Sequence, residues 1–298
     1  METIYEKTQV KQRLKSLRNI MRIISKSPSS LTGFIIILIF AGMATIGPII
    51  VPLDRTAHPG KRFLPPSLEH PLGTDFAGRD VLSQIIHGSR DVLTVAFLTA
   101  LITVFIALTI GIFSGFVGGK IDTVLTSITD IFLIIPSFPL LIIIAASMPR
   151  ALSPIEVAGI ISIVSWAGLA RSIRSQVLSI KESPFIEAAR CLGLSRIHIV
   201  FNEILPNLSP YIAMNLVLSI IHAIYSQVGL FFLGVLPFTS VNWGVMINIA
   251  MRQNALVNPK AWIYLMSPIV CIIILQTGFI LFLHALEEIF NPRLRAEA

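Results

Sequence analysis

The chain has 298 residues, of which 54% are hydrophobic and 13% are charged, and its formal net charge is +7. Because about 25% of the residues of a soluble protein are charged, this composition excludes an ordinary water-soluble fold. A chain of this length holds roughly six membrane spans but no further soluble catalytic domain, so any energy source would be another chain. The basic residues flank apolar runs, which indicates orientation in a membrane and argues against nucleic-acid binding.

Six apolar stretches are long enough for a transmembrane helix, which needs about 20 residues. The expected fold class is therefore an all-α integral membrane protein with six transmembrane helices. The expected spans are residues 27–53, 92–119, 123–148, 154–170, 210–236 and 261–284. We predict one domain without repeats, divided into a basic cytoplasmic tail (1–30), a first span with an extracytoplasmic loop and an interfacial helix (31–91), a five-helix core (92–290) and a cytoplasmic tail (291–298).

The distribution of Lys and Arg predicts how the chain is oriented. Placing the amino-terminal tail on the cytoplasmic side puts 15 of the 23 basic residues inside, so both termini are expected in the cytoplasm. The tail is too basic and too long for a simple cleaved signal peptide, and we expect an uncleaved first span. The two cysteines, Cys191 and Cys271, are predicted to form neither a disulfide nor a metal site.

A polar segment precedes the second span at residues 70–93, with the sequence HPLGTDFAGRDVLSQIIHGSRDVL. Gly73 and Gly78 allow tight turns, and Asp80 is placed to cap the helix that follows. That helix carries an apolar stripe for the membrane interface, formed by Val81, Leu82, Ile85 and Ile86. A structural elbow is the favoured interpretation, and contact with a transported solute is the alternative.

Polar residues within the spans are the candidates for a solute path. Asp130 interrupts the third span and can reach the interface or face the protein interior, and Gln227 lies in the fifth span. His222 and His284 stand alone near span ends, and we predict that they are packing or interfacial residues.

The longest cytoplasmic connection, residues 171–207, is patterned as two short helices. Ser183, as a cap, and Pro184 predict the start of the first helix, and Gly193 predicts its end. Ser195 is placed to cap the second helix, which is expected to end at Leu205-Pro206-Asn207. Each helix has an apolar face, formed by Phe185, Ala188, Ala189 and Leu192 in the first and by Ile197, Val200, Phe201 and Ile204 in the second. Packing within the chain and docking on a partner are equally compatible with this pattern.

This connection resembles the EAA signature of ABC importer permeases. The matching residues are Glu187, Ala188, Ala189, Gly193, Leu205 and Pro206. The resemblance implies that residues 183–205 form the coupling helix that docks in a groove of the ATPase. One position departs from the signature, because Glu203 stands where isoleucine or histidine is common.

Residues 70–93 resemble the hallmark of the C-type permeases of dipeptide, oligopeptide and nickel importers. The matching residues are Gly73, Thr74, Asp75, Gly78, Arg79, Asp80, Ser83, Gly88 and Arg90. The resemblance covers about residues 30–295, with further matches at Gly118-Gly119, Asp122, Asp130, Pro136, Phe232-Leu233-Gly234, Trp243-Gly244 and Asn291-Pro292-Arg293. Departures are Gln227 and Val228, where the family often has an acidic residue and alanine-like neighbours, and Asn291, which replaces a usual aspartate.

The resemblance implies a type I ABC importer permease fold with an extra N-terminal span, in a bacterial or archaeal cytoplasmic (inner) membrane. The subunit would form half of a translocation path for peptides or a related small solute. Its implied partners are a B-type permease subunit in a heterodimer, two ATPase subunits, an extracytoplasmic solute-binding protein and membrane lipid. The chain would bind no cofactor and catalyse nothing, because ATP and Mg would be bound by the ATPase subunits.

Three other functions were weighed. The same machinery can import nickel or a metal–chelator complex. A secondary transporter is supported by Asp130, His222 and the Gly/Pro-rich spans, but it leaves the EAA spacing unexplained. An intramembrane enzyme is disfavoured because the sequence has no HExxH, no GxSxG and no Cys/His cluster at metal spacing.

Overall fold

The computed structural model describes residues 27–148, 150–237 and 241–290, which are helical apart from turns, loops and an isolated bridge between Thr74 and Asp80. Five helices in this part of the chain are long and apolar enough to cross a membrane, and a bent helix pair adds a sixth span. The expected all-α membrane fold is confirmed. Of the predicted tails, residues 1–26 and 291–298 lie outside the described residues, Asn291 among them, and α2 already begins at Pro28.

The chain forms two compact units, Met1–Phe40 with Ile272–Ala298 and Ala41–Cys271. The first contains most of α2 (Pro28–Thr45) and the second part of α12 (Trp262–Phe290). Two glycines let these helices pack closely, because a Cβ atom on Gly33 would lie 2.7 Å from Leu281 Cβ and one on Gly278 would lie 2.5 Å from Ile36 Cγ2. Small residues at such contacts are typical of membrane helix pairs.

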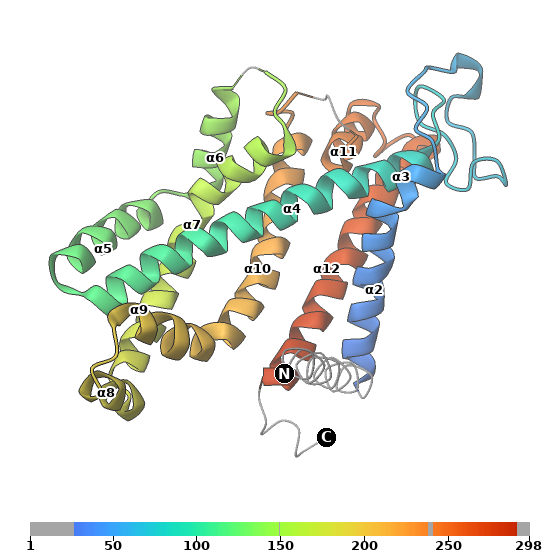
Figure 1. Ribbon diagram of the computed structural model, residues 1–298. Helices are drawn as coiled ribbons and strands as arrows, with labels where there is room; N and C mark the ends of the chain where they lie inside the picture. The colour runs from blue at the N-terminus through green and yellow to red at the C-terminus, as the bar shows by residue number, and fades with distance from the viewer. Residues whose placement is uncertain (1–26, 149, 238–240, 291–298) are drawn as a thin grey trace. The chain divides into compact units, whose positions relative to one another are not determined.

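The second unit is built on α4 (Val81–Ile112), which packs against α7 (Pro154–Lys181) and α10 (Leu205–Phe232). Gly111 and Gly115 allow the α4–α7 contact, since a Cβ atom on either would lie within 2.9 Å of Ile173 or Val177. One apolar cluster joins α4, α7 and α10 to α6 and α11, and a second joins them to α8. In Figure 1, α6 and α11 lie at one end of these three helices and α8 lies at the other.

The second span differs from its prediction, because no separate interfacial helix precedes it. One helix runs from Val81 through Ile112 and continues as the π-helical turn η2 (Phe113–Val117). The predicted boundary at residue 91 was wrong, because Arg90 and Asp91 mark the edge of the apolar stretch but do not interrupt the backbone hydrogen bonds of a helix. Asp80 caps this helix as expected, its carboxylate accepting a 2.6 Å hydrogen bond from the Ser83 amide.

The third span is broken. It consists of α5 (Gly119–Ile134) and α6 (Ser137–Ala146), which meet at 85°. Ile135 is extended, with φ −77° and ψ 125°, because the ring of Pro136 disfavours the α conformation for the residue before it. α5 begins at the end of the unit where α8 lies and α6 ends at the opposite end, so the pair crosses the unit as one broken span (Figure 1).

The fourth and fifth spans extend well beyond their apolar stretches. α7 continues past Ala170 to Lys181, and the helical path that ends in α10 begins with α9 (Arg196–His198) and the π-helical turn η3 (Ile199–Ile204). The prediction that Leu205-Pro206-Asn207 ends a short helix was therefore wrong. Pro206 is tolerated because the adjoining turn is π-helical, with the Leu205 amide bonded to the Val200 carbonyl, and a widened turn has room for the proline ring.

Several short elements connect the spans. They are α3 (Gly47–Ile50), the 3₁₀ turns η1 (Pro59–Lys61) and η4 (Pro259–Ala261), α8 (Pro184–Cys191) and α11 (Trp243–Arg252). The sequence pattern did not predict α11. Asn242 caps its start, because the side-chain oxygen accepts a 2.8 Å hydrogen bond from the Gly244 amide. A Cβ atom on Gly244 would lie 2.5 Å from the Val228 carbonyl oxygen of α10.

Candidate functional site

The segment that matches the EAA signature is anchored to the spans by one face of α8. Ile186 is fully buried and Ala189 is 5% exposed, and both belong to an apolar cluster that includes Val177 of α7 and Ile199. Pro184 is at the first helical position as predicted. Ser183 does not cap the helix through its hydroxyl, which instead donates a 2.5 Å hydrogen bond to the Ile180 carbonyl.

The predicted apolar face of α8 is mostly uncovered. Phe185 is 43% exposed and Leu192 is 78% exposed, whereas only Ala189 of the predicted stripe is buried. The signature residues Glu187 and Ala188 are also exposed. The helix therefore packs on its own chain through Ile186 and Ala189 and leaves a surface with both apolar and acidic side chains bare.

Gly193 ends α8 in the left-handed conformation, with φ +75°. The Leu194 amide donates to the Ala189 carbonyl at 3.1 Å and the Gly193 amide donates to the Arg190 carbonyl at 2.9 Å, a pairing that satisfies carbonyls left free at a helix end. Apart from its two chain neighbours, none of the described residues has an atom within 4 Å of a Cβ atom built on Gly193, so its constraint within this part of the chain is conformational. The predicted coupling helix at 183–205 is thus two helices joined at Gly193.

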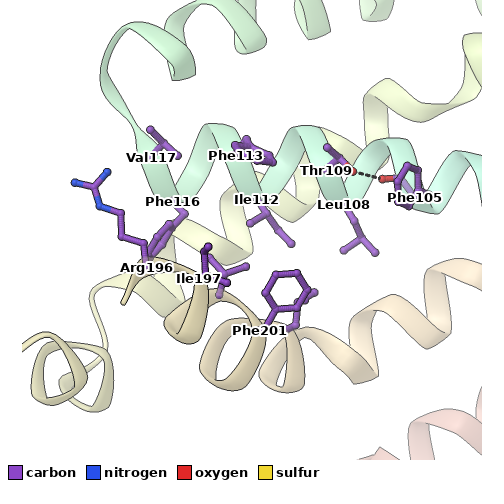
Figure 2. Close-up of a pocket in the computed structure, with 12 residues that line it drawn as sticks. Phe105, Leu108, Thr109, Ile112, Phe113, Phe116, Val117, Arg196, Ile197 and Phe201 are labelled. Atoms are coloured by element: carbon purple, nitrogen blue, oxygen red, sulfur yellow. Dashed lines mark hydrogen bonds between the residues drawn. The ribbon is translucent and has the colours of Figure 1, made fainter. Parts of the chain in front are cut away.

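The second helix of the segment borders an apolar groove of about 510 Å³. In Figure 2, Leu108, Ile112 and Phe116 of the α4 path point toward the helix that carries Ile197 and Phe201, and Arg196 stands at the rim. Ile197 is 72% exposed and Phe201 is 63% exposed, so these two residues of the predicted stripe do not pack within the chain. In a membrane protein, such a surface faces lipid or another subunit.

Two ion pairs fix α5 to α7 near the end where α8 lies. Arg174 donates from Nε and from a terminal nitrogen to the two Asp122 carboxylate oxygens, each at 2.6 Å. Asp130, predicted as a path residue, pairs with Arg171. The side chains of the Asp122 pair are 21% and 30% exposed, compared with 47% and 57% for the Asp130 pair, so we expect the Asp122 pair to contribute more to stability.

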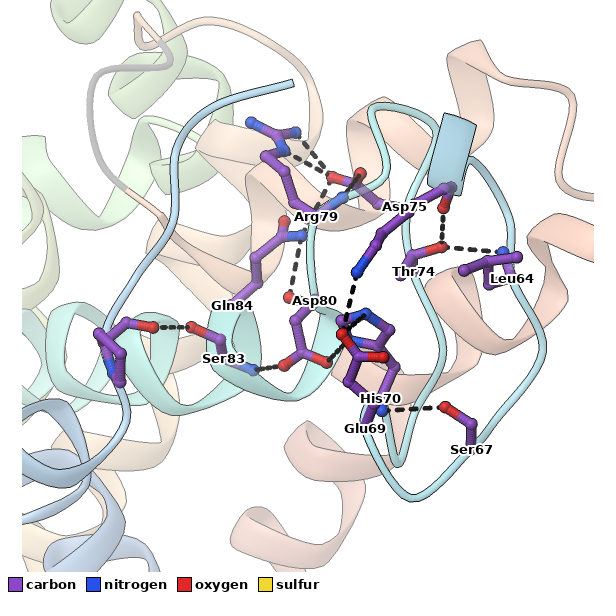
Figure 3. Close-up of polar contacts among 12 residues, drawn as sticks. Leu64, Ser67, Glu69, His70, Thr74, Asp75, Arg79, Asp80, Ser83 and Gln84 are labelled. Atoms are coloured by element: carbon purple, nitrogen blue, oxygen red, sulfur yellow. Dashed lines mark hydrogen bonds and ion pairs between the residues drawn. The ribbon is translucent and has the colours of Figure 1, made fainter. Parts of the chain in front are cut away.

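The segment before α4 folds around a buried carboxylate, as Figure 3 shows. Asp75 is fully buried and accepts hydrogen bonds from the amides of Ala77 and Arg79, the Arg79 guanidinium and the Gln84 side chain. Arg79 in turn lies over the Phe76 ring, 5.2 Å from its centroid. A buried charge is tolerated only when it is paired and hydrogen-bonded, and Asp75 meets both conditions.

The other residues of this segment hold the loop to the start of α4. The Thr74 hydroxyl donates to the Lys61 carbonyl at 2.5 Å and accepts from the Leu64 amide at 2.8 Å, and the Asp80 carboxylate is 3.0 Å from His70 Nδ1. At the rim, the Lys61 ammonium group donates a 2.9 Å hydrogen bond to Glu69, and this bond together with the lysine charge lowers the pKa of that carboxyl. The contacts of Thr74, Asp75 and Asp80 are those of a structural elbow.

Gly88 and Arg90 of the same motif lie within α4. A Cβ atom on Gly88 would lie 2.8 Å from Trp243 Cδ1, and the indole nitrogen of Trp243 donates to the Ile85 carbonyl at 3.1 Å. The motif therefore also contributes to the packing of α11 against α4. Arg90 is exposed and lines a small polar pocket with Arg55 and His87.

Gln227, predicted as a path residue, is fully buried and donates to the Val92 carbonyl of α4 at 2.6 Å. In this conformation the side chain joins two helices and does not face an open path. No group of three or more His, Cys, Asp or Glu side chains that could hold a metal ion is found among the described residues.

The chain matches known membrane transport proteins. The family described as binding-protein-dependent transport system inner membrane component matches residues 107–296. The dipeptide transport system permease protein DppC of Bacillus subtilis is 31% identical over 92% of this chain and 85% of its own length. The oligopeptide transport system permease protein OppC of Lactococcus lactis subsp. cremoris is 32% identical over 75% of this chain and 76% of its own. A chain of the MetNI methionine ABC transporter in inward-facing conformations has the same fold, with a TM-score of 0.54, 16% identity and coverage of 68% of this chain and 96% of that chain.

Proposed function

The chain belongs to the family of binding-protein-dependent transport system inner membrane components, and we propose that it forms half of the peptide translocation path of an ATP-driven importer. The observation that carries the proposal is the bare outer face of α8. α8 is fixed to α7 by buried Ile186 and Ala189, and it presents Phe185 and Leu192 outward. A partner that binds these exposed residues can therefore transmit its motion to α7.

The proposed partners are those that membership of this family implies, and the exposed face of α8 supports the contact with an ATPase. A second, B-type permease supplies the other half of the path, two ATPase subunits contact the α8 segments, and an extracytoplasmic binding protein delivers the solute. This chain binds no cofactor and hydrolyses nothing, while ATP and Mg are held by the ATPase subunits. ATP-driven closure of the ATPase pair moves α8 and biases the permeases between inward-open and outward-open states.

The proposed orientation places α8 and both chain termini in the cytoplasm. The bias of 15 of 23 basic residues supports it, as does the position of Arg171, Arg174 and Lys181 on the part of α7 that extends toward α8. Peptides are the proposed solute because both relatives described above are peptide permeases. No observation on the described residues favours nickel, a metal chelate or an ion-coupled mechanism, and the charge of Asp130 is paired with Arg171.

Leu192→Glu is expected to release the ATPase subunits from the complex, because it places a charge in the apolar part of the proposed contact. Leu68→Glu is the matched control, since Leu68 is a fully exposed leucine that lies in the loop before α4. Co-purification of the ATPase with the tagged complex measures the effect. We expect at least roughly tenfold less ATPase with Leu192→Glu. Equal recovery from both variants would contradict the docking role of α8.

A further inference from the structure

A cavity of about 530 Å³ lies beside the break between α5 and α6, within the unit formed by residues 41–271. Its volume is within the range of roughly 300–1,000 Å³ that is typical of small-molecule sites. Pro136 and Ser137 of the break line it, together with residues from α4, α7 and α10. Irregular backbone at membrane depth is tolerated where it lines a cavity, and broken helices mark binding sites in other transporters.

The lining of the cavity combines apolar side chains with a set of polar ones. None of the described residues that line it is Asp, Glu, Lys or Arg, and neither Asp130 nor Gln227 is among them. Its polar groups come from four helices and lie at helical spacing on three of them: Thr99 and Thr103 on α4, Ser165 and Ser172 on α7, and Asn215, Ser219 and His222 on α10, with Ser137 on α6. His222, expected from its sequence position to be a packing residue, therefore faces this cavity.

Several of these groups have hydrogen-bonding capacity that the described part of the chain does not use. The hydroxyls of Thr99 and Thr103 are buried, with the residues 2% and 3% exposed, and they have no protein partner. The Asn215 side-chain nitrogen donates to the Tyr211 carbonyl at 2.9 Å, which leaves its oxygen as an acceptor. Buried polar groups without a partner are costly, and a solute that pairs with them is therefore favoured.

We propose that this cavity is the part of the translocation path in this subunit that holds a peptide by its main-chain amide groups. This inference rests on the proposed function, and it adds that the subunit contacts the main-chain amide groups of the peptide. Threonine hydroxyls donate to peptide carbonyls, and the Asn215 oxygen accepts from a peptide N–H. A lining without carboxylate, Lys or Arg side chains does not select among the charges of a peptide's side chains, and it offers a metal cation no carboxylate ligand.

Two solutes that differ by one hydrogen-bond donor test this contact. The complete complex, with its ATPase subunits and binding protein, is reconstituted in proteoliposomes and given either dialanine or dialanine N-methylated at the peptide bond. The ratio of uptake of the two solutes is compared between the native complex and an Asn215→Leu complex. Because the same binding protein serves both complexes, a change in the ratio reports on the permease.

Asn215→Leu is expected to reduce the uptake of dialanine roughly fivefold and to change the uptake of the N-methylated solute little. The ratio of the two uptake rates should therefore approach one. Thr103→Val is expected to reduce uptake of both solutes, because it removes a donor to a carbonyl that both possess. Thr109→Val, on the same helix but outside the cavity, is the control and is expected to change neither rate.

An unchanged ratio with Asn215→Leu would overturn the inference, and so would an equal loss for both solutes. Absence of ATP-dependent dialanine uptake by the native complex would instead contradict the proposed function itself, so the two failures are distinguishable.

Discussion

Gly193→Trp is expected to leave the subunit inserted in the membrane and to uncouple ATP hydrolysis from solute uptake. The glycine has φ +75° and no atom lies within 4 Å of its missing Cβ, so a large side chain projects into space that this chain leaves open. We therefore expect the tryptophan side chain to disrupt the proposed contact with the ATPase. The left-handed backbone adds about 1–2 kcal/mol of strain, and uptake is expected to fall at least roughly tenfold.

Gly193→Asn is the matched control for that variant, because asparagine adopts the left-handed conformation more readily than other residues and adds little bulk. Uptake and ATP turnover are measured together in proteoliposomes, and subunit insertion is measured by the yield of purified complex. We expect the asparagine variant to retain most of its uptake. Normal uptake with normal ATP turnover by the tryptophan variant would rule out a coupling role for this turn.

Gly78→Ala is expected to have the largest effect on stability, because the loop before α4 has no room for a methyl group there. The glycine has φ +81°, and a Cβ atom would lie 2.2 Å from the main-chain oxygen of His58. A backbone oxygen cannot rotate away as a side chain does. The strain of about 1–3 kcal/mol for the backbone conformation is therefore only part of the cost.

The midpoint of thermal unfolding of the purified subunit should fall by at least about 5 °C. Gly60→Ala in the same loop is the control, because Gly60 has open space around its Cβ position. If the two variants unfold at the same temperature, the elbow around Asp75 does not depend on this turn.

The apolar stretches of the sequence predicted where the chain crosses the membrane but not where its helices end. Arg90 lies inside α4, and Arg171, Arg174 and Lys181 lie inside α7. Charged side chains mark the boundary of the hydrocarbon layer, because their solvation changes there. The backbone hydrogen bonds of a helix, in contrast, continue beyond this boundary into water. The boundaries predicted from charge therefore fell short of the structural ones.

Two prolines have opposite effects on the helices around them, and the sequence did not predict this difference. Pro136 breaks the third span at 85°, whereas Pro206 lies inside a continuous helical path. The difference comes from the π-helical turn at Ile199–Ile204, which widens the hydrogen-bonding pattern just before Pro206. A π turn has no residue signature comparable to a capping box, so the sequence could not predict it.

The candidate sites were predicted unequally. Gly193 and Asp80 were placed correctly because a left-handed turn and a helix cap each restrict the residue type. The buried face of α8 was not predicted correctly. Ile186 and Phe185 are both apolar, and only the packing of α8 on α7 determines that Ile186 is the buried one. The cavity was not predicted because no Asp, Glu, Lys or Arg marks it in the sequence, although Asn215, Ser219 and His222 recur at the spacing of one helix face.

We have proposed that this chain forms half of the translocation path of an ATP-driven peptide importer. The most direct test is uptake of a labelled dipeptide into proteoliposomes that contain the native complex, compared with the same complex lacking this subunit. We expect uptake that requires this chain, ATP and the binding protein together. Dipeptide uptake by this chain alone without ATP, or uptake of nickel but of no peptide by the complete complex, would contradict the claim.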